Sequence, residues 1–151
     1  MALNSKISDD LKSAMKSGDK TRLETLRTIR ASLMQKEIEK RGSGQPMSEE
    51  DELGVLTSAA KKRKESMELF EKGGRLELVE QEGRELAIIQ EYLPKQLSLE
   101  EIEGVVKRIV SQVGASSQKD FGRVMPLVMK ELRGKGEGRL IQDCVRKHLN
   151  G

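Results

Sequence analysis

A glycine-rich segment near the C-terminus, RGKGEGR, carries residue types that bind phosphate groups. It runs from Arg133 to Arg139, and its three glycines would let the backbone approach a phosphate closely. Arg133, Lys135 and Arg139 add positive charge just before a helix, whose N-terminus offers free N–H groups and the positive end of a dipole. The spacing differs from that of a P-loop. Two interpretations stay open: a phosphate-contacting loop, or a flexible connection between helices with ordinary solvated charges.

Three cations upstream extend this candidate surface. Lys119, Arg123 and Lys130 are separated by four and then seven residues, which predicts that they lie on one side of a single helix. The chain has a net charge of +3, and its positive excess is concentrated near the C-terminus. From residue 104 onward the sequence holds 10 lysines and arginines against 4 acidic residues. An anionic partner is therefore expected to bind the C-terminal third.

A second basic run, Lys61 to Lys64, lies close to three glutamates that neutralise much of its charge. Arg63 and Lys64 also interrupt the apolar stripe of their helix. A buried or half-buried ion pair with an acidic residue of a neighbouring helix explains this run as well as ligand binding does. We favour the structural interpretation, and we extend it to the arginines at 22, 27 and 30.

Cys144 and His148 are four residues apart on one helix face, the spacing of two metal ligands or of a thiol beside a base. The chain has no second Cys or His, so a zinc site would need carboxylates for its other ligands. Both residues lie on an apolar stripe, so we predict that they pack in the core. The acidic residues are spread along solvated helix faces, with no pair isolated in an apolar setting. We therefore expect no catalytic residues, no metal site, no cofactor and no independent catalysis.

Apolar residues recur at helical spacing through the first 93 residues and predict four helices. Gly18 ends the first, and Asp19 caps the second, which breaks at residues 42–46. A capping box of Ser48 and Asp51 begins the third, and the fourth stops before Pro94. The positions predicted to be buried include Met15 on the first helix, Met34 and Ile38 on the second, and Leu76 on the fourth. Long helices joined by short turns predict an antiparallel bundle.

The remaining residues predict three shorter helices. A second capping box, Ser98 with Glu101, begins a helix that Gly114 ends. The next is expected from residue 118 to 132, with Pro126 either kinking it or marking a late first turn. The last follows the glycine-rich segment. The predicted fold is all-α, with an N-terminal antiparallel helical bundle (1–95) followed by a small basic three-helix C-terminal domain (96–151).

The composition also indicates the cellular compartment in which the protein is expected. No apolar stretch approaches the roughly 20 residues of a membrane span, and the N-terminus lacks the apolar run of a signal peptide. Cys144 is the only cysteine, so nothing suggests an oxidising compartment. A cytoplasmic location is expected.

Several segments in the same order along the chain resemble the GatB/YqeY family. They are AMKSGDKTRLETLRTIRASL, KKRKESMELFEKGGRLELVEQE, YLPKQLSLEE, VGASSQKDFGRVMPLVM and RGKGEGRLI. The resemblance covers the chain from about Leu3 to Leu149. This sequence departs from the family pattern at Gly136 and Glu137, where Ala and Asp are common, and at Pro126, where a small residue is expected.

The resemblance implies an N-terminal helical bundle, a small helical C-terminal domain and a role in transfer-RNA biology. The same module forms the tail of the B subunit of the bacterial glutamine-dependent amidotransferase, and it occurs on some glutaminyl-tRNA synthetases. In those settings it touches transfer RNA and contains none of the catalytic machinery. The carbon–nitrogen ligase activity given to free-standing copies is inherited by homology. The candidate RNA-binding residues are Lys119, Arg123, Lys130, Arg133, Lys135 and Arg139.

Three functions follow as hypotheses. The first is an accessory module that binds transfer RNA, or a tRNA-handling enzyme such as an amidotransferase or an aminoacyl-tRNA synthetase. The alternative is a helical protein–protein interaction module without nucleic-acid binding, which an exposed apolar groove would favour. An amidotransferase-linked enzyme activity is the third, and it would need a deep pocket with perturbed carboxylates.

Overall fold

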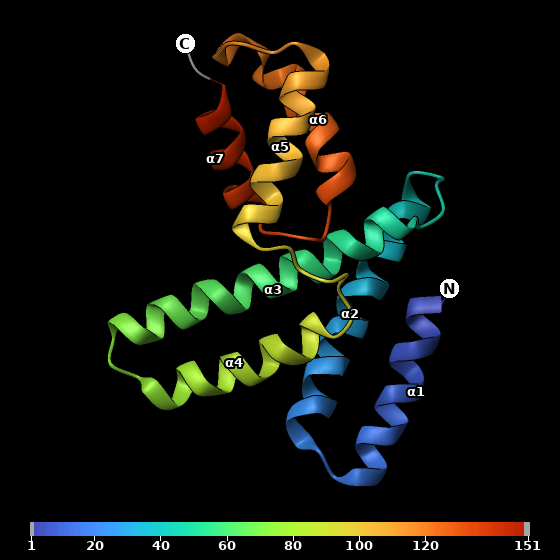
Figure 1. Ribbon diagram of the computed structural model, residues 1–151. Helices are drawn as coiled ribbons and strands as arrows, with labels where there is room; N and C mark the ends of the chain where they lie inside the picture. The colour runs from blue at the N-terminus through green and yellow to red at the C-terminus, as the bar shows by residue number, and fades with distance from the viewer. Residues whose placement is uncertain (1, 150–151) are drawn as a thin grey trace. The chain divides into compact units, whose positions relative to one another are not determined.

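The computed structural model describes residues 2–149, which contain seven α-helices, one short 3₁₀ turn and no strand (Figure 1). The all-α prediction is therefore confirmed. The chain divides into two compact units, Met1–Leu93 and Pro94–Gly151. Each unit has its own cluster of buried apolar side chains, so each is described by itself. No helix in residues 2–149 has the length and apolar character needed to cross a membrane.

The N-terminal unit consists of two antiparallel helical hairpins. Its helices are α1 (Ala2–Ser17), α2 (Lys20–Gly42), α3 (Glu49–Lys72) and α4 (Leu76–Gln90). Helix α1 pairs with α2 and α3 pairs with α4, while α2 also packs against both α3 and α4 (Figure 1). The predicted bundle therefore consists of two hairpins, α1–α2 and α3–α4, and α2 makes the main contacts between them. Its fully buried side chains are Ile7, Leu26, Ile29, Leu33, Leu56 and Ile89.

Local signals in the sequence begin and end these helices as predicted. The Asp19 carboxylate accepts a hydrogen bond from the Arg22 amide at 3.1 Å and caps α2. Ser48 and Asp51 form the reciprocal capping box of α3. Gly18 turns the chain between α1 and α2 with φ +73°, a left-handed conformation that favours glycine.

Four apolar side chains predicted to be buried are exposed instead. They are Met15, Met34, Ile38 and Leu76, with exposed fractions of 60%, 51%, 66% and 64%. Met34 follows the fully buried Leu33, so it lies about 100° further around α2, away from the packed face. Ile38 is four residues beyond Met34, on the same side. Helical spacing alone could not show that neighbouring helices cover only a narrow stripe of α2.

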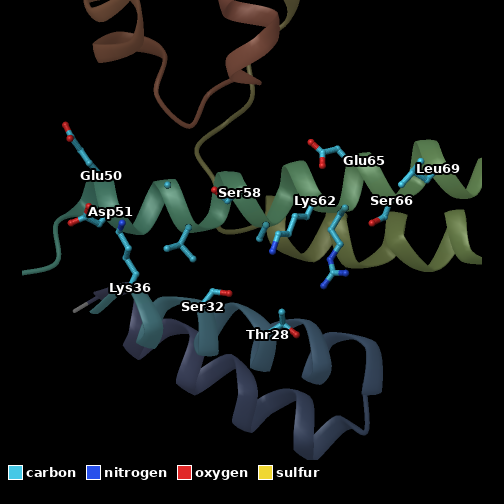
Figure 2. Close-up of a pocket in the computed structure, with 14 residues that line it drawn as sticks. Thr28, Ser32, Lys36, Glu50, Asp51, Ser58, Lys62, Glu65, Ser66 and Leu69 are labelled. Atoms are coloured by element: carbon cyan, nitrogen blue, oxygen red, sulfur yellow. The ribbon is translucent and has the colours of Figure 1, made fainter. Parts of the chain in front are cut away.

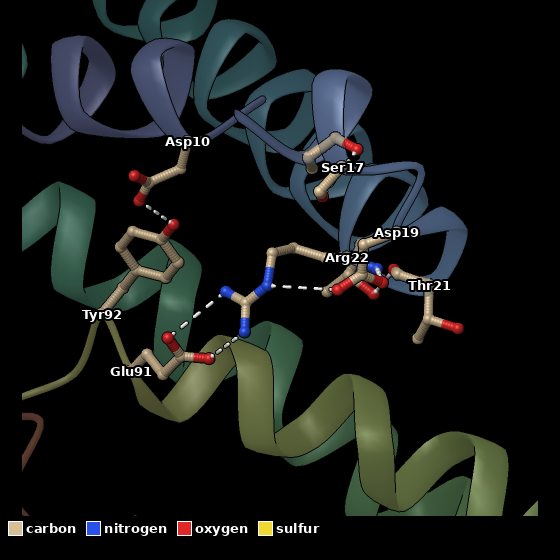
Figure 3. Close-up of polar contacts among 9 residues, drawn as sticks. Asp10, Ser17, Asp19, Thr21, Arg22, Glu91 and Tyr92 are labelled. Atoms are coloured by element: carbon tan, nitrogen blue, oxygen red, sulfur yellow. Dashed lines mark hydrogen bonds and ion pairs between the residues drawn. The ribbon is translucent and has the colours of Figure 1, made fainter. Parts of the chain in front are cut away.

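Polar contacts tie the end of α4 to the first hairpin (Figure 3). The Arg22 guanidinium of α2 donates to both carboxylate oxygens of Glu91, at 2.8 and 3.3 Å. The Tyr92 hydroxyl donates to the Asp10 carboxylate of α1, and burial together with this bond raises the pKa of the phenol. Arg22 thus has a structural partner 69 residues away. Residues 91 and 92 hold α1, α2 and α4 together.

A half-buried ion pair joins α3 to α4. Arg63 lies 3.2 Å from Glu82 and 3.1 Å from Glu85, and all three side chains are a quarter exposed or less. This confirms the structural interpretation of Arg63. Lys61, two residues earlier, lies 4.0 Å from Glu65 on its own helix.

The C-terminal unit packs three helices around a separate core. They are α5 (Leu99–Val113), α6 (Phe121–Leu132) and α7 (Gly138–His148), with a 3₁₀ turn at Gln118–Asp120 before α6. The capping box of Ser98 and Glu101 begins α5, and Gly114 ends it in a left-handed conformation. The single helix predicted from 118 to 132 is wrong, because Asp120 accepts the Ser116 and Ser117 amides and holds residues 118–120 in the tighter turn. Pro126 lies at the sixth residue of α6, past its first turn.

The Tyr92–Asp10 bond predicts a loss of stability on removal of the hydroxyl. Tyr92→Phe should lower the free energy of unfolding by about 1.5 kcal/mol, because it leaves a half-buried carboxylate without its donor. Urea unfolding of Tyr92→Phe, Asp10→Ala and the double variant measures the coupling between the two side chains. Strictly additive losses would show that the contact contributes nothing.

A buried carboxylate on α3 predicts that removing its charge raises the free energy of unfolding, by an amount that depends on pH. Glu52 is 8% exposed, and its Oε2 atom has no hydrogen-bond partner among the described residues. Burial raises the pKa of this carboxyl. The folded state therefore favours the protonated form, and the stability that this form provides below about pH 4 is lost as the pH rises through the folded pKa.

Glu52→Gln should accordingly raise the free energy of unfolding by about 1 kcal/mol at neutral pH, and by almost nothing near pH 4. Thermal and urea unfolding across this pH range measures the difference. Glu68→Gln is the matched control, because Glu68 is an exposed glutamate of the same helix. A gain of equal size at both pH values would contradict the role assigned to the buried charge.

Candidate nucleic-acid interface

The six candidate RNA-binding residues divide between the two ends of α6. Lys119 lies in the 3₁₀ turn before α6, and Arg123 lies in the first turn of the helix. Lys130 is in the last turn, and the other three follow in the loop and at the start of α7. A 12-residue helix is about 18 Å long, which separates the two groups. The prediction that Lys119, Arg123 and Lys130 share one helix is therefore wrong for Lys119.

Arg123 is engaged by an acidic neighbour. It lies 3.1 Å from Asp120, which also accepts two backbone amides. Those amide bonds, followed by Arg123, hold the pKa of the Asp120 carboxyl below its ordinary value, so this carboxylate is a fixed negative charge. Since Arg123 has this partner, the group at the start of α6 offers less positive charge than the sequence suggested.

The glycine-rich loop is anchored by hydrogen bonds from the segment that precedes α5. The Leu97 amide donates to the Lys135 carbonyl at 2.8 Å, and the Gln96 side-chain amide donates to the Gly134 carbonyl at 2.6 Å. The Lys135 amide donates in turn to the Leu132 carbonyl at 2.9 Å. These hydrogen bonds anchor the loop to the segment before α5, and they favour a defined loop conformation over a flexible connection. The sequence does not reveal the roles of Gln96 and Leu97, because nothing local marks a contact made 38 residues away.

The glycines of the loop have different structural roles. Gly134 is buried and adopts φ +77°, a conformation open to glycine at little cost. Gly136 packs so closely that a Cβ there would lie 3.0 Å from Cδ1 of Ile102. Gly138 is the first residue of α7 and has open space beside it. Close backbone approach to a ligand is thus available at Gly138, while the other two glycines fix the loop against the core.

The N-terminus of α7 has the features of an anion-binding site. Its N-cap, Glu137, is extended and makes no side-chain capping hydrogen bond. The amides of the first turn therefore lack the side-chain acceptor that caps α2, α3 and α5. Lys135 and Arg139 flank this turn, are exposed, and form no ion pair with any described residue, while Lys135, after Arg108, helps to lower the pKa of the Glu131 carboxyl. Backbone donors, the positive dipole end and two available cations coincide here.

Cys144 packs in the core as predicted, whereas His148 is only partly buried and lies outside the core cluster. Cys144 is buried, and burial raises the pKa of its thiol, which keeps it protonated and unreactive. The Nδ1 atom of His148 lies 2.9 Å from the Cys144 carbonyl oxygen, within one turn of α7. Residues 2–149 contain no group of three or more His, Cys, Asp or Glu side chains that could hold a metal ion.

The fold and site together define a small all-helical protein of two compact units, the second of which carries a rigid cationic loop. The chain belongs to the YqeY-like protein family, whose family model matches residues 4–149. It is 41% identical over 59 residues to the E subunit of the glutamyl-tRNA(Gln) amidotransferase of Methanocaldococcus jannaschii, a match that covers 36% of this chain and 9% of that protein. It is also 33% identical over 87 residues to altered inheritance of mitochondria protein 41, mitochondrial, of Eremothecium gossypii, covering 58% and 46% of the two chains. The chain thus spans less than half the length of either relative.

The anchored loop predicts a local effect of removing Gln96. Gln96→Ala should speed hydrogen exchange at the amides of residues 134–136 by about fivefold, the equivalent of losing one hydrogen bond worth about 1 kcal/mol. Gln112→Ala is the control, because Gln112 is an exposed glutamine near the end of α5. Unchanged exchange at these amides in Gln96→Ala would show that backbone contacts alone hold the loop.

Proposed function

We propose that this protein is an accessory module that binds transfer RNA, and that residues 96–151 make the contact. The proposal rests on the N-terminus of α7, where uncapped backbone amides meet the exposed Lys135 and Arg139. Lys130 and Arg133 come from the end of α6 and widen the cationic region around the same loop. Lys119 and Arg123, at the other end of α6, are a separate group of candidate contacts.

The physical character of the loop suits a nucleic-acid backbone. A folded RNA is recognised mainly through its phosphates and shape, with lysine, arginine and helix N-termini as the common contacts. Only three residues of the chain are aromatic, which disfavours binding by base stacking on single strands. Because the loop is rigid, little conformational entropy is lost when it binds.

The similarity to an amidotransferase subunit supports a proposal for the enzyme that this protein binds. The relative from Methanocaldococcus jannaschii is named for an amidotransferase that acts on glutamyl-tRNA(Gln), and part of this chain is similar to part of it. A tRNA amidotransferase or an aminoacyl-tRNA synthetase is therefore the enzyme partner we propose. Carbon–nitrogen ligase activity is not proposed for this chain alone, because the shared segment is 9% of that protein. A cytoplasmic location stays a prediction.

The second candidate is a helical protein–protein interaction module. Exposed apolar side chains on the N-terminal unit favour it, notably Met34 and Ile38 on α2 and Leu69 on α3. The two functions are compatible, since the apolar residues are on the N-terminal unit and the cationic loop is on the other.

Binding of unfractionated transfer RNA across a salt series tests the proposal. The double variant Lys135→Ala/Arg139→Ala should lower the slope of log affinity against log salt by about two, because two phosphate contacts are lost. At about 0.1 M salt this corresponds to roughly 50-fold weaker binding. Fluorescence anisotropy with labelled tRNA measures both quantities.

The control is Lys12→Ala/Lys16→Ala, which removes two exposed lysines of α1 at the same four-residue spacing. Equal slopes for the two double variants would contradict a contact through the loop. If the unaltered protein binds no tRNA even at low salt, the RNA function is wrong, and the interaction module takes its place.

A further inference from the structure

A groove lies between α2 and α3 of the N-terminal unit, with a volume of about 770 Å³ (Figure 2). Its two walls carry matching strips of side chains, each spaced by four residues along a helix. On α2 the strip is Thr28, Ser32 and Lys36, and on α3 it is Ser58, Lys62 and Ser66. Spacing by four keeps each strip on one face of its helix, so hydroxyl and ammonium groups border one channel.

The serines of these strips have hydroxyls available for a ligand. Threonines of the same helices donate to the carbonyl four residues earlier: Thr25, Thr28 and Thr57, at 2.8, 3.0 and 2.7 Å. Ser32, Ser58 and Ser66 make no hydrogen bond within the part of the chain that the structure describes. Serine is a weak helix former, so three unbonded serines along one groove bring the helices no stability of their own.

Lys62 is the cation of its basic run that both lines the groove and forms no ion pair with a described residue. Arg63 is bound by Glu82 and Glu85, and Lys61 pairs with Glu65. Lys62 is exposed and forms no ion pair with a described residue. In Figure 2 its side chain extends from α3 toward α2, whereas Glu65 points away from α2.

Three carboxylates, those of Glu50, Asp51 and Glu65, line the groove together with Lys36, Lys62 and Arg63, and they limit how much of an anion it can accept. Asp51 accepts the Ser48 amide and hydroxyl, which hold the pKa of its carboxyl low, and it lies 3.4 Å from Lys40. Because this carboxylate stays charged, it repels an extended polyanion from that end of the groove. The positive centre around Lys62 therefore fits a short stretch of backbone, with one or two phosphates.

We propose that this groove binds the phosphodiester backbone of the RNA, as a second contact on the N-terminal unit. The inference rests on the proposed RNA-binding function. Lysine and serine side chains are common donors to phosphate oxygens, and Lys62 with Ser58 and Ser66 combines them on one face of α3. A partner helix would need apolar anchors along its length, and the groove offers mainly Val55, Ala59 and the terminal Leu69.

The first test compares neighbouring lysines in tRNA binding across a salt series. Lys62→Ala should lower the slope of log affinity against log salt by about one, and weaken binding about eightfold near 0.1 M salt. Lys61→Ala removes the same charge one residue earlier, from a lysine that does not line the groove, and should leave the slope unchanged. Thermal melts of both variants confirm that the helices are intact.

The second test places negative charge in the groove. Ser58→Asp/Ser66→Asp should weaken tRNA binding by at least tenfold, because two carboxylates would face the phosphates. Ser5→Asp/Ser13→Asp is the control, since these exposed serines of α1 have the same eight-residue separation. Comparable affinities for the two double variants would overturn the proposal.

The outcomes separate this inference from the function on which it rests. If tRNA binds and depends on Lys135 and Arg139, but Lys62→Ala behaves as Lys61→Ala does, the groove proposal alone is wrong. The α2–α3 face would then be assigned to a protein partner. If the unaltered protein binds no tRNA, both proposals fail.

Discussion

The hydrogen bonds from residues 96 and 97 to the glycine-rich loop determine the geometry of the candidate interface. Through them the segment before α5 holds the Gly134 and Lys135 carbonyls, and Gly136 is pressed against Ile102. The loop cannot shift without breaking these contacts, so the direction in which α7 begins is fixed. The amides at the start of α7 are thereby held in a defined orientation, which would lower the entropic cost of the anion binding proposed for this loop.

Ion pairs with carboxylates determine which basic side chains are available to bind an anionic ligand. The chain has 28 basic and 25 acidic residues, so acidic partners are abundant. Arg22, Arg63 and Arg123 each face a carboxylate within 3.2 Å, and these contacts join helices or turns. Among the cations without an ion pair to a described residue are Lys135 and Arg139 beside the glycine-rich loop and Lys62 in the α2–α3 groove. Arginine forms bidentate pairs with carboxylates that lysine cannot reproduce, which is why it is found in the structural contacts.

The fold was predictable because its signals are local. Capping by Asp19, Ser48 and Ser98 depends on residues three positions apart, and the sequence displays it directly. The burial of Met34 and Ile38 was predicted wrongly, because apolar spacing shows which face of a helix is apolar but not how much of that face a neighbour covers. The turn before α6 was missed for a related reason, since helical periodicity continues through residues that Asp120 holds in a 3₁₀ conformation.

The sequence by itself determined the helical class, the helix limits set by caps and glycines, and the concentration of positive charge after residue 104. Those properties depend on residues near one another in the chain, where spacing and composition are sufficient. Only the tertiary structure decided which charges are neutralised, that the glycine-rich loop is rigid, and that Lys62 lines a groove with serines from two helices. Each of these depends on residues brought together from distant parts of the chain, and packing selects those partners in a way that no local pattern records.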